Sequence, residues 1–110
     1  MIQQHTLKCW PAFFDAVACG EKTFELRLDD RGFQKGDELI LLRTREDNPE
    51  LIEYDAYMED GRTPTRDAHP AHTLRRRITY ALHGPRFGLA AGYVILALAP
   101  IPSNEEDEDV

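Results

Sequence analysis

The sequence lacks the features that mark a secreted or membrane-spanning protein. No apolar run approaches the roughly 20 residues that a helix needs to cross a bilayer. The N-terminus also lacks a basic segment followed by an apolar stretch, which a secretion signal would have. We therefore expect a cytoplasmic protein that has no membrane partner.

Motifs that hold a cofactor or a metal ion are also missing. We find no glycine-rich phosphate loop, no zinc-ligand spacing, no Ser/His/Asp signature and no internal repeat. The pair His69 and His72 has no further ligand cluster beside it, and Pro70 disrupts a helical spacing of the two rings. We expect a surface loop there, no metal site and no cofactor.

Cysteine is scarce, with Cys9 and Cys19 as the only two. They flank a predicted helix, and a rise of about 1.5 Å per residue places their Cα atoms beyond the roughly 7 Å limit for a disulfide. We expect two free thiols. A small apolar filler is the favoured role, because no base can be placed beside either cysteine.

Excess acidic charge is confined to the C-terminus. The formal net charge is -7, but five of the 20 acidic residues lie between Glu105 and Asp109, which leaves 15 acids against 13 basic residues elsewhere. We expect residues 1–102 to form a single domain and residues 103–110 to form a disordered acidic tail. The tail would serve solubility or bind a protein partner.

Hydrophobic periodicity predicts an α+β domain dominated by strands, with one early helix packed on a small mixed β pseudo-barrel. The helix should begin at Pro11 and stop at Gly20, with Phe13, Phe14 and Val17 on its apolar stripe. A short helical turn near Leu89 is possible. The predicted strands cover residues 2–8, 22–28, 39–42, 74–82 and 93–98.

Residues 45–73 are rich in Asp, Glu, Pro, Arg and His, and we expect a variable loop or a hairpin insertion there. The strand that follows contains three consecutive arginines, which alternate between its two faces. On one interpretation they form a basic rim for phosphates. On the other they pair with acids of the preceding loop. The arginines are Arg75, Arg76 and Arg77.

The strand over residues 22–28 carries the most promising polar residues. Its alternation predicts a buried face of Phe24, Leu26 and Leu28, and an opposite polar face of Thr23, Glu25 and Arg27. Glu25 and Arg27 rise on the same side about 7 Å apart at the backbone, and Lys22 leans in from the preceding turn. The three charges either bind one polar ligand or form surface ion pairs that contribute little.

This stretch reads Gly20-x-Lys22-x-x-Glu25-x-Arg27 and follows a short helix, and it resembles the signature of the ASCH domain, a PUA-like family linked to RNA. Further matching segments are His5-Thr6-Leu7-Lys8, Asp30-Arg31-x-Phe33-x-x-Gly36-Asp37 and Gly88-Leu89-x-x-Gly92-Tyr93-Val94. Together they are similar to a bacterial and phage branch of that family. The resemblance covers roughly residues 5–44 and 74–98.

The resemblance implies a cleft between the early helix and the barrel that holds RNA or a nucleotide. Lys22, Thr23, Glu25 and Arg27 would line it, with Lys22 and Arg27 contacting phosphate or a base edge. Trp10 or Tyr80 would offer a stacking face and Arg77 a phosphate contact; Trp10 is alternatively a core anchor beside the helix start.

Two other functions remain open from the sequence. Some ASCH-like members are hydrolases of an acylated cytidine or of RNA, and here Lys22 and Glu25 would be the catalytic pair. This chain has Glu25 where the amidohydrolase-like members have threonine. The third possibility is a protein-interaction module that uses the acidic tail or the middle loop. The oligomeric state is undetermined.

Overall fold

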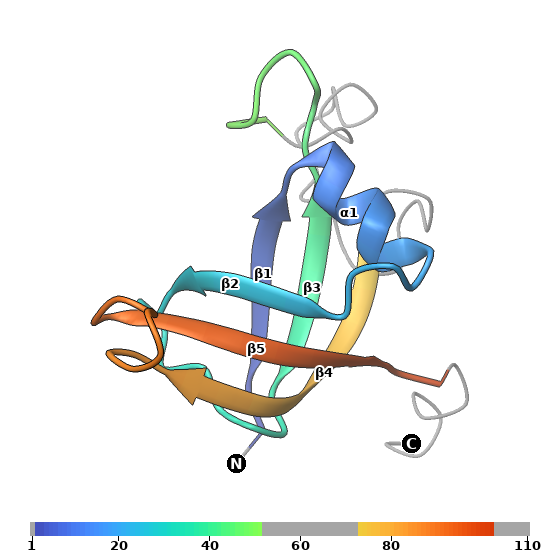
Figure 1. The fold of residues 1–110 in the computed structure, drawn as a ribbon. Coiled ribbons are helices and arrows are strands. Elements are labelled where there is room, and N and C mark those ends of the chain that lie inside the picture. The colour runs from blue at the N-terminus through green and yellow to red at the C-terminus, as the bar shows by residue number, and fades with distance from the viewer. Residues whose placement is uncertain (1, 52–72, 103–110) are drawn as a thin grey trace.

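The structure is a computed structural model that describes residues 2–51 and 73–102. In these residues the chain forms one helix and five strands (Figure 1). Their order is β1 Gln4–Cys9, α1 Pro11–Ala18, β2 Phe24–Leu28, β3 Glu38–Arg43, β4 Thr73–His83 and β5 Tyr93–Pro100. Every predicted strand is present, and the helix lies where the proline and glycine signals placed it. Residues 89–91 contain no helical turn, so that expectation was wrong.

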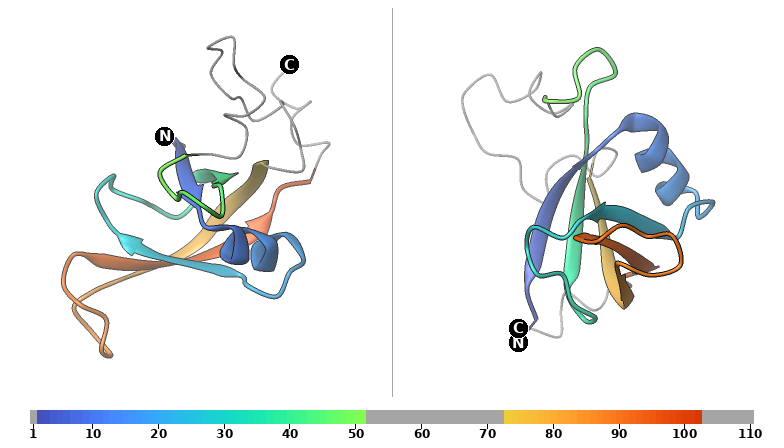
Figure 2. Two further views of the ribbon diagram at one scale, coloured as in Figure 1. Left: turned by 90° about the horizontal axis from the view of Figure 1, so that it is seen from above. Right: turned by 60° about the vertical axis from the view of Figure 1, so that its left-hand side comes forward.

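The five strands form one mixed sheet in the order β1-β3-β4-β5-β2. β1 runs parallel to β3, whereas the pairs β3–β4, β4–β5 and β5–β2 are antiparallel. The sheet curls so that β2 and β5 cross in front of β1 and β3 (Figures 1 and 2). The prediction of a strand-dominated α+β fold, a small mixed pseudo-barrel with an early helix, is confirmed.

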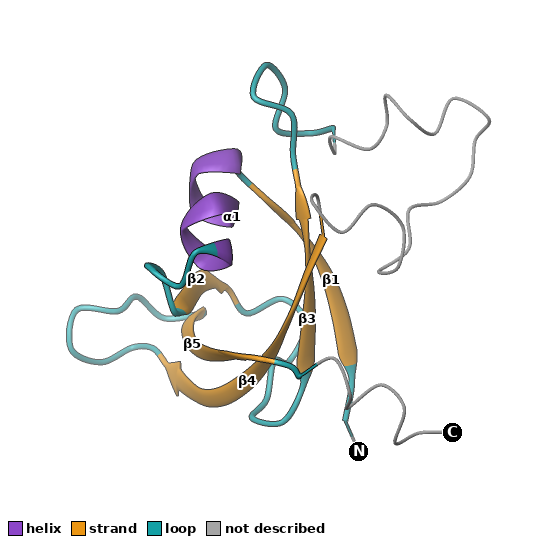
Figure 3. Ribbon diagram, turned by 90° about the vertical axis from the view of Figure 1, so that its right-hand side faces the viewer, coloured by secondary structure: helices purple, strands orange, loops and turns teal. Residues whose placement is uncertain are grey.

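An irregularity in β4 produces much of this curl. The register against β5 shifts between Ile78 and Tyr80, which marks a β-bulge, and a bulge bends its strand and increases the local twist. In Figure 3, β4 arches from the side of β3 round to β5. The extra residue also exchanges the faces of the strand. Ile78 is buried and Tyr80 is 61% exposed, although residues two apart in a regular strand share one face.

The core lies inside the curl and under α1. Pro11 begins the helix, Phe14 and Val17 are its buried apolar residues, and Gly20 follows it with φ 85°, a conformation that glycine adopts without steric cost. Phe13 is 54% exposed, so its predicted place on the buried stripe was wrong. The helix packs against this core, whose members are Leu7, Cys9, Phe14, Val17, Phe33, Leu39, Leu41, Ile78, Val94, Leu96 and Leu98.

The two faces of β2 are reversed relative to the prediction. Phe24, Leu26 and Leu28 are between 45 and 54% exposed, whereas Glu25 is only 6% exposed. The polar face therefore points into the curl and the apolar face points out of it. The interpretation of Glu25 and Arg27 as a solvated outer surface was wrong.

The cysteine prediction is confirmed, because both thiols are free, with Cys9 buried and Cys19 exposed. Of the middle segment, residues 45–51 form a loop in which the amide of Arg45 donates to the carbonyl of Leu51 at 2.9 Å. The predictions for His69, His72 and the rest of the 45–73 insertion, and for the acidic tail 103–110, lie outside the described residues.

Candidate functional site in the barrel seam

β1 and β2 are the two edges of the sheet over the described ranges, and the curl brings these edges toward each other. Side chains, rather than a strand ladder, bridge them. Arg27 Nη2 donates to the carbonyl of Lys8 at 2.5 Å, and Arg31 Nη1 donates to the carbonyl of Thr6 at 2.7 Å. We call this join between β1 and the segment Glu25–Arg31 the seam.

Glu25 organises the charges of the seam. Its Oε1 accepts from Lys22 Nζ at 3.1 Å and its Oε2 accepts from Arg27 Nε at 2.7 Å. A buried carboxylate is costly unless such charged donors satisfy it. Lys22, Glu25 and Arg27, which the sequence singled out, therefore converge rather than splay into solvent.

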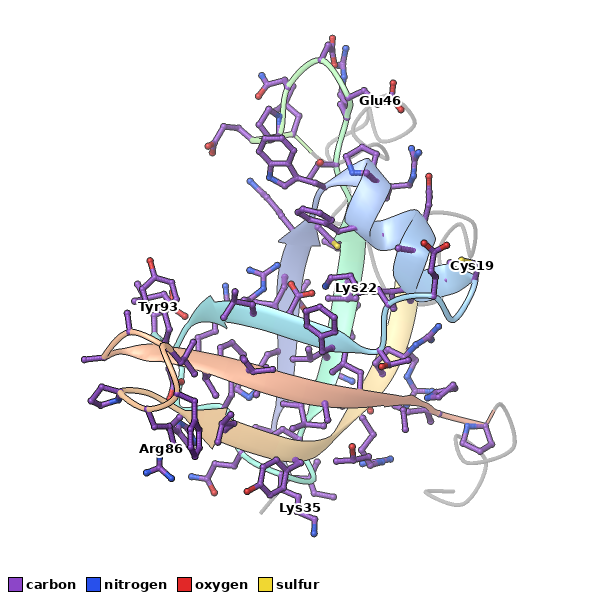
Figure 4. All side chains as sticks on the ribbon, viewed as in Figure 1. Cys19, Lys22, Lys35, Glu46, Arg86 and Tyr93 are labelled. Atoms are coloured by element: carbon purple, nitrogen blue, oxygen red, sulfur yellow. The ribbon has the colours of Figure 1, made fainter. Side chains whose placement is uncertain are left out.

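Lys22 reaches this cluster from the turn between α1 and β2, as predicted, and Figure 4 shows it between the helix and β2. Its Nζ also donates to the carbonyl of Phe24 at 2.6 Å. The same ammonium lies 4.7 Å from the ring centroid of Phe24 and 5.6 Å from that of Phe13, within cation–π range. The ammonium of Lys22 is therefore occupied by contacts within the protein and holds Glu25 in place.

A pocket of about 420 Å³ opens along the seam. Three basic residues, Lys8, Arg27 and Arg31, border it together with the acids Glu25 and Asp30. The ammonium of Lys8 donates to the carbonyl of Glu50. Arg27 uses its Nε and Nη2 in the contacts with Glu25 and Lys8. The lining is completed by aromatic and apolar residues, namely Leu7, Cys9, Trp10, Phe13, Leu26, Leu28 and Tyr93.

Trp10 belongs to the rim of this pocket and not to the core. It lies between β1 and α1 with φ -59° and ψ 145°, and its side chain is 60% exposed. The alternative of a core anchor was wrong, whereas the stacking of a base on Trp10 stays a prediction. Phe13 and Tyr93 add two partly exposed rings to the same lining.

Other residues proposed from the sequence lie elsewhere. Tyr80 borders a second hollow of about 450 Å³ with Lys35 and His83, and Thr23 borders a third of about 180 Å³ with Lys22. Arg77 donates to the carbonyl of Gly36 at 3.2 Å on the β3 side of β4. Tyr80, Thr23 and Arg77 are therefore absent from the lining of the seam pocket.

The arginine cluster of β4 is held largely by structural contacts. Arg75 forms a two-pronged ion pair with Glu38 of β3, at 2.6 Å from Nε and 3.0 Å from Nη2. Arg76 donates to the carbonyl of Val17, and burial lowers the pKa of its guanidinium. Arg75 is thus paired, but with an acid of β3 rather than with one of the preceding loop, most of which lies outside the described residues.

Sequence reasoning missed several residues of the site. Lys8 and Arg31 lie in segments that matched the ASCH pattern, yet neither received a role, because only the curl brings β1 beside the turn after β2. It also missed the buried pair His5 and Asp37, whose Nε2 and Oδ2 atoms are 2.9 Å apart. This pair fixes the start of β1 to the turn before β3.

Cys9 lines the pocket but is poorly suited to nucleophilic chemistry. Burial, followed by the negative charge of Glu25, raises the pKa of its thiol to about 11, although Lys22 and Arg27 partly oppose this. A thiol with so high a pKa carries almost no thiolate near neutral pH. Its role as an apolar filler is consistent with this environment.

The family model for a domain of unknown function, DUF3850, matches residues 4–98. The chain belongs to the DUF3850 family. The match runs from the start of β1 into β5 and thus contains every residue of the seam pocket. No curated protein matches the sequence significantly.

The described part of this DUF3850 domain contains neither a cluster of metal-binding side chains nor a membrane-spanning helix. Within residues 2–51 and 73–102, no three His, Cys, Asp or Glu side chains are grouped so that they could hold a metal ion. Over the same residues, no helix has the length and apolar character required to cross a membrane.

Proposed function

We propose that this DUF3850 domain binds RNA or a nucleotide in the seam pocket. The observation that carries the proposal is the pairing of an exposed ring, Trp10, with guanidinium groups fixed by protein contacts, Arg27 and Arg31, in one pocket. The volume of about 420 Å³ falls within the range of small-ligand sites. The resemblance of the Lys22, Glu25 and Arg27 segment to the ASCH signature supports the same function.

Phosphate is the group that the basic side chains suit best. A guanidinium offers several donors in a fixed plane and binds phosphate through two of them at once. Arg27 is held by Glu25 and by the carbonyl of Lys8, so little conformational entropy remains to be lost on binding. The lining carries three basic against two acidic residues, which leaves a positive balance for an anionic ligand.

The rings suit a base. Stacking on an aromatic side chain is worth about 1–3 kcal/mol per base and tolerates any sequence. Trp10 is the most exposed of the three rings in the lining, at 60%. Glu25 has an ordering role here, because it already accepts from two cations and holds them in place. This arrangement favours binding over the hydrolase alternative, in which Glu25 would take a proton.

Trp10 makes the proposal directly measurable, because it is the only tryptophan in the chain. A base that stacks on its ring should quench the fluorescence of the protein. We would titrate a mononucleotide and a short single-stranded RNA, and repeat each titration by calorimetry. We expect Arg31→Ala to weaken RNA binding about tenfold and to lower the salt dependence by about one phosphate contact.

Arg45→Ala is the matched control, because Arg45 pairs with Asp47 outside the pocket and should leave the affinity unchanged. Absence of binding at about 1 mM ligand, or equal affinities for wild type, Arg31→Ala and Trp10→Ala, would refute the proposal. The same samples should be analysed for products. Turnover that disappears in Glu25→Gln would replace the binding function with the hydrolase.

A further inference from the structure

The outward face of β2, β5 and β4 is apolar and exposed. Register aligns its residues in rows across the three strands: Phe24 with Ala97 and Tyr80, Leu26 with Ile95 and Leu82, and Leu28 with Tyr93. The larger side chains are strongly exposed: Phe24 45%, Leu26 52%, Leu28 54%, Tyr80 61% and Tyr93 42%. We call these eight residues the outer face.

None of the eight residues is charged, although charged residues make up 30% of the chain. Isolated exposed apolar residues are ordinary, but a contiguous patch of this kind marks an interaction surface. A surface that binds nucleic acid needs basic residues among its rings. Only two cations lie beside this one: Lys22, which contacts the Phe24 ring but is paired with Glu25, and Lys35, which borders the same hollow as Tyr80. Its composition therefore points to a protein partner.

We infer that the outer face binds a second copy of this chain, so that two sheets pack face to face. A two-fold axis brings the same patch against itself, and a patch without charge meets its own copy without repulsion between like charges. The packing of two apolar sheet faces at about 10 Å is the arrangement found in β-sandwiches. Ile95, in the middle row of the central strand, would lie near the axis.

The exposed area of the outer face is large enough for a weak dimer. Taking about 200 Å² for a large apolar side chain, the exposed fractions of the five large residues amount to about 500 Å² per copy. Two copies would bury about 1,000 Å², which is the lower limit for a specific interface. We therefore expect a dimer that forms at about 10–100 µM protein rather than an obligate one.

The dimer would also border the seam pocket, because Leu26, Leu28 and Tyr93 belong both to the outer face and to the pocket lining. A partner copy would thus stand beside the opening. The inference does not depend on the proposed function, since it rests on exposure and charge alone. Its test uses residues of the outer face both inside and outside the pocket lining.

The test is sedimentation velocity of the full chain between about 5 and 500 µM. We expect a monomer–dimer equilibrium for wild type. Leu26→Lys and Tyr80→Lys should each raise the dissociation constant of the dimer at least about tenfold. Each substitution places one lysine on both copies, so that two positive charges face each other in the interface. Both positions are more than half exposed, so the variants should fold, and thermal melts would verify this.

Ile2→Lys is the control, because Ile2 is 64% exposed but precedes β1, a strand that contributes no residue to the outer face. It should dimerise as wild type does. A monomer throughout the concentration range would overturn the inference, as would a dimer that Leu26→Lys and Tyr80→Lys leave intact. A monomer in which Tyr80→Lys alters RNA affinity would identify the face as a nucleic-acid platform instead, and would equally overturn it.

Discussion

Replacing Glu25 with glutamine tests whether this carboxylate organises the seam. The substitution preserves size and shape but removes the charge that Lys22 Nζ and Arg27 Nε approach at 3.1 and 2.7 Å. It leaves two cations partly buried beside a neutral amide, and the amide nitrogen must face one of them. We expect the seam to loosen and the domain to lose stability.

The magnitude follows from the burial of the three side chains. Breaking a fully buried ion pair from one side costs about 3–5 kcal/mol. Here the side chain of Glu25 is 8% exposed, but those of Lys22 and Arg27 are 17 and 26% exposed, so water screens and partly solvates the cations that remain. We expect a loss of about 1–3 kcal/mol in the free energy of unfolding. At roughly 4 °C per kcal/mol, the melting temperature should fall by about 4–12 °C.

Urea unfolding followed by Trp10 fluorescence and by circular dichroism would measure this loss. Glu46→Gln is the matched control, because Glu46 is 82% exposed and approaches Arg43 only at 4.0 Å, so its loss should change stability by less than about 0.5 kcal/mol. If Glu25→Gln were as stable as Glu46→Gln, the carboxylate would not organise the seam. The argument that Arg27 is preordered for a ligand would then fail as well.

Two further predictions concern other buried groups. At pH 8, a thiol reagent should modify Cys19 at least about a hundredfold faster than Cys9, because Cys9 is buried with a pKa raised to about 11, and equal rates in the folded protein would contradict this. Burial raises the pKa of Asp37, but bonds from His5, Gln3 and Gln34 outweigh it and hold the pKa below the ordinary 3.8. The ionised carboxylate of Asp37 therefore stabilises the fold above pH 3.8, and this stabilisation is lost as the pH falls through the lowered pKa. Asp37→Asn should lose less stability than wild type between pH 7 and pH 3 in urea melts, and parallel losses would contradict the assignment.

The elements of this fold were predictable because local signals agree with the tertiary structure. Pro11 and Gly20 bracket α1, and the turn ending in Gly36 and Asp37 immediately precedes β3. The apolar run of β3 is buried because it lies between β1 and β4. These features need only the chemistry of neighbouring residues, so one sequence sufficed.

The direction in which each strand face points was harder to predict. Alternation shows that a strand has two different faces but does not show which of them points inward. In β2 the apolar face was assigned to the core by default, and the structure reverses it. In β4 a single bulge exchanged the faces of Ile78 and Tyr80. The members of the seam pocket from β1 and from the turn at Arg31 were missed for a related reason, since the contact from Arg31 to Thr6 spans 25 positions in the sequence.

The reversal of β2 itself argues that the seam and the outer face are selected for binding. Turning Phe24, Leu26 and Leu28 inward would have stabilised the domain by burying apolar surface, about 25 cal/mol for each Å². The chain instead buries Glu25 with two cations, an arrangement that rarely exceeds an apolar core in stability. In β2 the sequence gives up folding stability on both faces of the strand. Such a loss is expected where the residues serve a function other than folding. The proposed charged ligand on the inner face and the proposed second copy on the outer face would together provide such a function.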